Sequence, residues 1–116
     1  MLVFGAVVCP PKELLTPCTC DANNEVIQCT NGDFNVHTMF HRLSVSKANF
    51  SHIFKKFDFN VNYGTCFKKI RANIFGSIKF KEVVIWSCDK ITEIDKYAFT
   101  SIEDTLQYLT IANSWQ

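Results

Sequence analysis

The stretch Phe54–Asn62, which reads FKKFDFNVN, decides the fold because the chain repeats it twice in related form. It returns as Phe80–Cys88, FKEVVIWSC, and again as Leu106–Ser114, LQYLTIANS. The first, fourth and sixth residues of each copy are large and apolar, and the step between copies is 26 residues. Self-similarity at a fixed period of this size is typical of repeat proteins, in which each unit is stacked on the next.

A second pattern lies between these strings. Apolar residues follow the spacing Phe67-x-x-Ile70-x-x-x-Ile74-Phe75-x-x-Ile78, and the same spacing recurs as Ile91-x-x-Ile94-x-x-x-Ala98-Phe99-x-x-Ile102. The step is 24 residues, which is compatible with 26 if residues 63–66 hold two extra residues and two are missing before Phe80. Each unit is therefore expected to run out along a strand and to return along a second apolar segment.

These patterns together resemble the extracellular leucine-rich repeat, which reads L-x-x-L-x-L-x-x-N and continues with I-x-x-x-A-F-x-x-L. The resemblance covers residues 54–116, about two and a half repeats, with phenylalanine at several leucine positions. It implies an α/β fold, a short leucine-rich repeat solenoid with parallel strands on its concave face and an irregular or helical convex side. The ninth position is Asn62, Cys88 and Ser114 in turn, so the usual asparagine ladder would be incomplete.

Cysteines dominate the first part of the chain. Four of the six lie within a polar, turn-rich stretch as Cys9, Cys18, Cys20 and Cys29, which indicates a disulfide framework and an oxidising compartment. Six cysteines allow fifteen connectivities. A zinc site at Cys18 and Cys20 is disfavoured because structural zinc sites pair ligands two to four residues apart and need a second such pair.

Residues 9–33 resemble the disulfide-bonded N-terminal cap of secreted leucine-rich repeat proteins. The resemblance implies the pairs Cys9–Cys20 and Cys18–Cys29. The cap and the phenylalanine-rich first repeat are most similar to a group of arthropod secreted proteins related to the non-catalytic subunit of Oplophorus-type (shrimp) luciferin monooxygenase. That similarity implies an accessory role without catalysis.

Two further cysteines belong to the repeats. Cys88 is at the ninth position of its unit and Cys66 lies just past the ninth position of the preceding one, so both are expected on neighbouring turns. A disulfide is one interpretation. The other is that both are small buried side chains.

The remaining N-terminal segments carry signs of secretion. Residues 1–8 are interpreted as the remnant of a signal peptide, and residues 34–53 as a helical connector with an amphipathic helix over its first half. Asn49 opens the triplet Asn49-Phe50-Ser51, an acceptor for N-glycosylation. No apolar run is long enough to cross a membrane. We therefore expect a secreted glycoprotein.

The expected concave face follows from the alternation of side chains along a strand. It consists of three rows that cross the repeats, with Trp86 as an exposed aromatic anchor for a protein partner or, alternatively, a cover for a thin sheet. The rows are Lys56, Glu82 and Tyr108; Asp58, Val84 and Thr110; and Asn60, Trp86 and Ala112.

Other kinds of site find little support in the sequence. A net charge of +1 gives no nucleic-acid footprint. His37 and His41 have a spacing that can hold zinc on a helix, but Thr38 stands where a metalloprotease has glutamate, so we expect exposed or capping histidines. His52 with Cys66 is a weak candidate for a base and nucleophile. The acidic residues Asp89, Glu93, Asp95, Glu103 and Asp104 are scattered, and we expect neither a catalytic site nor a cofactor nor a metal.

The sequence therefore predicts a non-catalytic extracellular module that binds a protein partner on its concave face, with no nucleic acid and no membrane span. Only five residues follow Ile111, so the last strand is expected to leave an open edge for further repeats, a dimer or a partner. The alternatives are a small disulfide-rich secreted inhibitor or toxin-like protein, and an accessory subunit of a secreted oxidoreductase.

Overall fold

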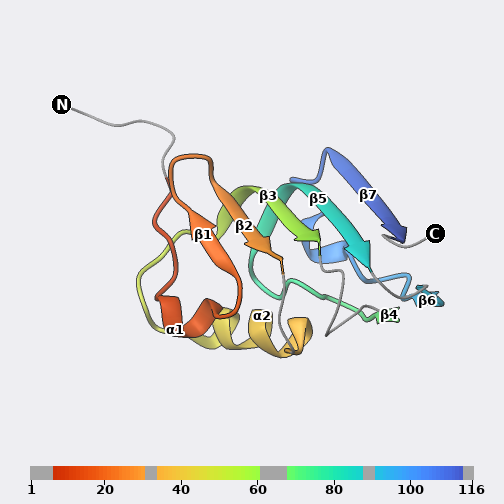
Figure 1. The fold of residues 1–116 in the computed structure, drawn as a ribbon, viewed down its shortest axis with the longest axis horizontal. Helices are drawn as coiled ribbons and strands as arrows, with labels where there is room; N and C mark the ends of the chain where they lie inside the picture. The colour runs from red at the N-terminus through yellow and green to blue at the C-terminus, as the bar shows by residue number, and fades with distance from the viewer. Residues whose placement is uncertain (1–6, 31–33, 61–67, 88–90, 114–116) are drawn as a thin grey trace.

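The computed structural model describes residues 7–30, 34–60, 68–87 and 91–113 of the chain. It is a mixed α/β fold built on a five-stranded sheet with the order β1-β2-β3-β5-β7. The strands are β1 (Thr19–Asp21), β2 (Val26–Cys29), β3 (Ile53–Asn60), β5 (Lys79–Ser87) and β7 (Tyr108–Asn113). Strand β1 pairs antiparallel with β2, and all other neighbours are parallel (Figure 1).

The 26-residue repetition corresponds to the pairing of the parallel strands: residues that are 26 apart in sequence lie side by side in the sheet. Phe57 pairs with Val83, which pairs with Leu109, and Phe59, Ile85 and Ile111 form the next row. Side chains in these rows point to the same face because residues two apart along a strand share a face. The apolar fourth and sixth positions of the repeated string are therefore brought together across three strands.

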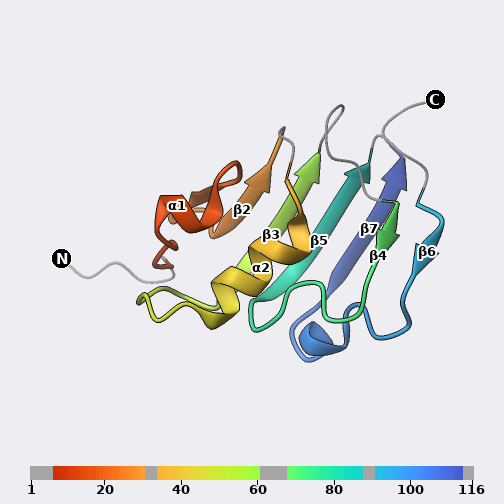
Figure 2. The same ribbon diagram turned by 90° about the horizontal axis from the view of Figure 1, so that it is seen from below.

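The 24-residue repetition forms a second, smaller sheet. Strands β4 (Lys69–Ile70) and β6 (Glu93–Ile94) pair in parallel, with Ile70 beside Ile94. The 3₁₀-helix η1 (Thr100–Ile102) follows. Figures 1 and 2 show that β4, β6 and the helices lie on one side of the large sheet, so the core is between these two layers.

Helix α2 (Val36–Val45) confirms the helix expected in the first half of residues 34–53. Asn35 caps its N-terminus by accepting a hydrogen bond from the Thr38 amide at 3.0 Å. The side chains of Val36, Met39, Phe40 and Leu43 are buried, which is the apolar stripe of an amphipathic helix. None of the described helices is long and apolar enough to cross a bilayer.

Two disulfides hold the N-terminal part together, Cys9–Cys20 and Cys18–Cys29, and they confirm the pairing that the resemblance implied. They link the short helix α1 (Lys12–Leu15) and its flanks to β1 and β2. The same pairing rules out a zinc site at Cys18 and Cys20. Disulfides of this kind are typical of proteins that fold in an oxidising compartment.

Phenylalanine rings fill the centre of the core. Phe40, Phe57, Phe75 and Phe80 are fully buried, and every pair among these four has ring centroids 5.0–6.0 Å apart. Five of these six pairs are edge-to-face, an arrangement that the ring quadrupole favours. This ring cluster joins α2, β3 and β5 with the segment after β4.

The last repeat differs from the preceding one in its burial. Val83 and Ile70 have 0% and 1% of their surface exposed, whereas their paired counterparts Leu109 and Ile94 have 45% and 47% exposed. The reason is positional: in the described part of the chain, no strand lies beyond β7 or β6. The C-terminal end of both sheets therefore presents apolar side chains to solvent.

Candidate functional site

The candidate site is the outer face of the large sheet, which we define as the face turned away from the helices. Its residues alternate with the buried positions of each strand. The register places all three predicted rows side by side: Lys56, Glu82 and Tyr108; Asp58, Val84 and Thr110; Asn60, Trp86 and Ala112.

Sequence reasoning missed that two of these rows continue into the N-terminal part. Val26 pairs with Lys56, and Gln28 pairs with Asp58. Across the hairpin Asp21 pairs with Val26 and Thr19 with Gln28, so both rows cross five strands. The cap lacks the repeated motif, and the only sequence signal for this extension is the alternation of Val26 and Gln28 with the buried Ile27 and Cys29.

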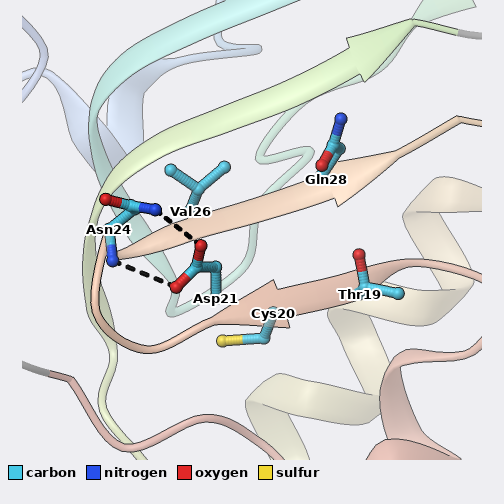
Figure 3. A pocket seen from close by; sticks show the side chains of 6 residues that line it. All are labelled: Thr19, Cys20, Asp21, Asn24, Val26 and Gln28. Atoms are coloured by element: carbon cyan, nitrogen blue, oxygen red, sulfur yellow. Dashed lines mark hydrogen bonds between the residues drawn. The ribbon is translucent and has the colours of Figure 1, made fainter.

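A shallow depression of about 380 Å³ lies on this extension (Figure 3). It is lined by Thr19, Cys20, Asp21, Asn24, Val26 and Gln28. The Asp21 carboxylate accepts hydrogen bonds from the backbone amides of Asn23 and Asn24 at 3.0 and 3.1 Å and from the Asn24 side chain at 2.7 Å. These bonds, led by the one from the Asn24 backbone, hold the pKa of Asp21 below its usual value. Asp21 is therefore a charged residue that fixes the hairpin turn.

The other end of the outer face is more apolar. Trp86 and Tyr108 have 39% and 67% of their surface exposed. Between the two ends, Lys56 Nζ lies 4.0 Å from Asp58 Oδ2, a loose ion pair at the limit of direct contact. The face thus combines exposed aromatic surface with charged and amide groups, a composition common in protein interfaces.

Of the two histidines whose spacing on α2 could hold zinc, His37 has a packing role and His41 does not. The Nε2 atom of His37 accepts a hydrogen bond from the Arg71 amide at 3.1 Å, which ties α2 to the segment after β4. Burial, and next the positive charge of Arg71, lower the pKa of His37. His41 is exposed, and no group of potential metal ligands occurs among the described residues.

His52 contacts two described residues, and its pairing with Cys66 as base and nucleophile stays a prediction because Cys66 lies outside the described residues. Its Nδ1 atom is 3.3 Å from the Ser77 hydroxyl, and its ring stacks on Phe50 with centroids 4.7 Å apart. Cys66 and Cys88 lie outside the described residues, and the question of a disulfide between them stays a prediction.

The scattered acidic residues have local partners. Asp104 bonds to Lys79 Nζ at 2.8 Å, Glu93 lies 3.5 Å from Lys69, and Asp95 caps the Tyr97 amide at 2.8 Å. The hydrogen bond from Lys79 lowers the pKa of Asp104. Glu103 is exposed, and Asp89 lies outside the described residues. Three of the five carboxylates therefore have a described hydrogen-bond or ion-pair partner.

The predicted acceptor Asn49 is exposed, while its triplet takes part in the fold. The Ser51 amide donates to the Val8 carbonyl at 2.8 Å, and the Ser51 hydroxyl accepts from the Val8 amide at 2.8 Å. Val8 is the last residue of the predicted signal-peptide remnant, and in the structure these hydrogen bonds join it to the segment before β3. Glycosylation of Asn49 and the end of the signal-peptide remnant stay predictions.

Comparison of the chain with protein-family profiles, with curated proteins and with solved structures gives no significant match.

Proposed function

We propose that this protein is a secreted, non-catalytic module of the leucine-rich repeat kind that binds a protein partner with the outer face of its large sheet. In this proposal the strands β3, β5 and β7 are the concave side of a short solenoid, and residues 9–33 are its N-terminal cap. The cap covers the first parallel strand with an antiparallel one.

The observation that carries the proposal is the unbroken register of the outer face. Identical spacing in successive strands places side chains in straight rows, so that Asp58, Val84 and Thr110 lie next to one another. Such a surface is rigid because its backbone is hydrogen-bonded and its reverse side packs on the ring cluster. A rigid surface loses little conformational entropy on binding, which favours affinity.

Trp86 is the residue expected to contribute most to binding. It lies on a central strand with 39% of its surface exposed, next to Asn60 and Ala112 in its row. Large aromatic side chains at the centre of an interface are frequent hot spots. The rival reading as a disulfide-rich inhibitor would place binding on the cap residues, away from Trp86.

The test compares Trp86→Ala with the intact protein in affinity capture from the extracellular fluid of the source organism. A partner retained by the intact protein is identified, purified and titrated against both proteins. We expect Trp86→Ala to raise the dissociation constant by about 30-fold or more, which corresponds to about 2 kcal/mol. Thermal unfolding should change little because Trp86 lies outside the core.

Tyr97→Ala is the matched control, since Tyr97 is an exposed aromatic residue, 54% exposed, in the other layer of the fold. It should bind the partner as tightly as the intact protein. Equal affinity of all three proteins for the partner would refute the assignment of the outer face. Weaker binding by a Gln28→Ala variant alone would instead locate binding at the cap end of the outer face.

A further inference from the structure

The triplet Asn49-Phe50-Ser51 is a motif that partner binding by the outer face leaves unused. We propose that Asn49 carries an N-linked glycan, and that this glycan is attached only before the N-terminal segment, residues 7–9, docks on the triplet. Docking then closes the site, so folding of the cap and glycosylation compete for Ser51. The inference rests on the proposed secretion and is independent of the proposed partner.

The chemistry of the modification determines what the site must present. The Nδ2 atom of Asn49 forms a bond to C1 of the first sugar of a polyprenyl diphosphate-linked oligosaccharide. The bond between that C1 and the diphosphate oxygen breaks, the polyprenyl diphosphate leaves, and one amide proton is released. Because the acceptor pattern requires a hydroxyl two residues after the asparagine, the transferase has to reach the side chains of Asn49 and Ser51 together.

The two ends of the triplet differ in accessibility in the folded protein. Asn49 is exposed, so a glycan there extends into solvent and is compatible with the fold. The Ser51 hydroxyl, in contrast, accepts a hydrogen bond from the Val8 amide at 2.8 Å. The Ser51 amide donates to the Val8 carbonyl, also at 2.8 Å. The N-terminal segment therefore occupies one half of the acceptor site.

The neighbours of Ser51 prevent the triplet from opening alone. Phe50 is 7% exposed, belongs to the hydrophobic core and stacks on the His52 ring with centroids 4.7 Å apart. The His52 carbonyl accepts a hydrogen bond from the Lys79 amide of β5 at 2.7 Å. Presenting Asn49 and Ser51 to a transferase would pull Phe50 out of the core and break the bonds on either side of it. The folded protein opens in this way only rarely.

The disulfide Cys9–Cys20 ties the docked segment to the cap. Cys9 directly follows Val8, and its partner lies in β1. Val8 is thereby part of the fold, and in this proposal the mature chain retains it. The whole segment precedes Asn49 in the sequence, so it is present before the triplet when the chain is made from its N-terminus. Formation of this disulfide therefore limits the time available for glycosylation.

The test offers the full chain to an oligosaccharyltransferase in detergent-solubilised microsomes with its lipid-linked oligosaccharide donor. Asn49-Phe50-Ser51 is the only Asn-x-Ser/Thr triplet in the sequence, so a single increase in mass reports this site. The reduced, alkylated and unfolded chain should be modified readily. The oxidised, folded chain should be modified about 100-fold more slowly or less, because only the open fraction of molecules presents the triplet. Asn49→Gln should take up no oligosaccharide in either form.

Cys9→Ser combined with Cys20→Ser tests the role of the docked segment. The variant keeps the other cap disulfide, and circular dichroism checks its fold. The folded variant should be modified about 10-fold faster than the folded wild type or more, because the N-terminal segment then detaches from Ser51 more easily. If the variant does not fold, the two forms of the wild type still decide. Wild-type chains glycosylated while reduced should refold and form both disulfides, because Asn49 is exposed.

An unfolded wild-type chain that takes up no oligosaccharide would overturn the assignment of Asn49 as an acceptor. Equal rates for the folded and unfolded wild type would show that docking does not close the site. A folded double-cysteine variant as slow as the folded wild type, or a glycosylated chain that cannot form both disulfides, would also contradict the proposal. Trp86→Ala should behave like the wild type in this assay, which separates failure of this inference from failure of the proposed binding function.

Discussion

His37 shows how a residue pattern with a familiar spacing acquires a different role. Its i,i+4 partner His41 lies on the exposed side of α2, whereas the ring of His37 is half-buried and accepts the Arg71 amide. A neutral imidazole has one nitrogen that accepts a hydrogen bond, and a protonated one has none. The contact between α2 and the segment after β4 therefore depends on a neutral His37.

This dependence predicts a loss of stability at mildly acidic pH. Because the pKa of His37 in the folded state is lower than the ordinary 6.5, the unfolded chain takes up a proton first as the pH falls. The free energy of unfolding should be highest above pH 6.5, decrease below it and level off once folded His37 is protonated as well. Urea unfolding at a series of pH values measures this profile.

His37→Gln is the matched variant, because its side-chain oxygen can accept the Arg71 amide and does not titrate. Its stability should change less than that of the wild type over the same pH interval. Asp21 and Asp104 do not confuse the comparison: their pKa values lie below the ordinary 3.8, so they lose their stabilisation only at lower pH. An identical slope in both proteins would assign the pH dependence to another group.

At the scale of elements, close contact between α2 and the turn before β5 depends on a glycine. Gly76 has a φ of +57°, in the left-handed region that other residues rarely adopt. A β-carbon there would overlap the Ser44 hydroxyl and come within 3.4 Å of the Phe40 carbonyl. The Ser44 hydroxyl itself bonds to Phe40 O at 2.7 Å and to the Ser77 amide at 2.8 Å, which joins the two elements.

Gly76→Ala should therefore destabilise the protein by about 2 kcal/mol, from the unfavourable φ and the steric overlap together. Thermal and urea unfolding measure the change. A double-mutant cycle with Ser44→Ala separates the two causes: removing the hydroxyl relieves the overlap, so the added cost of Gly76→Ala should shrink but not vanish. A full, additive cost in the Ser44→Ala background would show that overlap contributes nothing.

The sequence predicts some elements well and others poorly, for a physical reason. The pairing of Phe57 with Val83 and Leu109 follows from the repetition, because equal spacing and a shared apolar face fix the register. The antiparallel β1 and the continuation of the rows through Val26 and Gln28 do not follow, because the cap has no repeat to compare. The exposure of Leu109 and Ile94 does not follow from the sequence, since repeat position alone does not reveal that a strand is the last one in the described sheet.

At the scale of the whole molecule, the two ends of the large sheet are unequal. At the first end, β1 covers β2, two disulfides tie the strands to their flanks, and Ile27 and Cys29 are fully buried. At the other end, β7 pairs on one side only in the described chain, and Leu109 is 45% exposed. The ring cluster lies between them, against β3 and β5.

This asymmetry predicts the order in which backbone amides exchange with solvent in the dilute protein. Amides open through local unfolding when few buried contacts hold their element in place. The amides of β3 and β5 that are bonded within the sheet should exchange slowest, because opening them disrupts the ring cluster. Those of Tyr108, Thr110 and Ala112, although directed towards β5, should exchange faster, because β7 can detach without exposing the cluster. Hydrogen exchange followed by NMR measures each amide, and reduction of the disulfides should lower the protection of β2 towards that of β7. Equal protection of β3, β5 and β7 would mean that the sheet opens as one unit. The exposure of Leu109 would then not make β7 easier to detach.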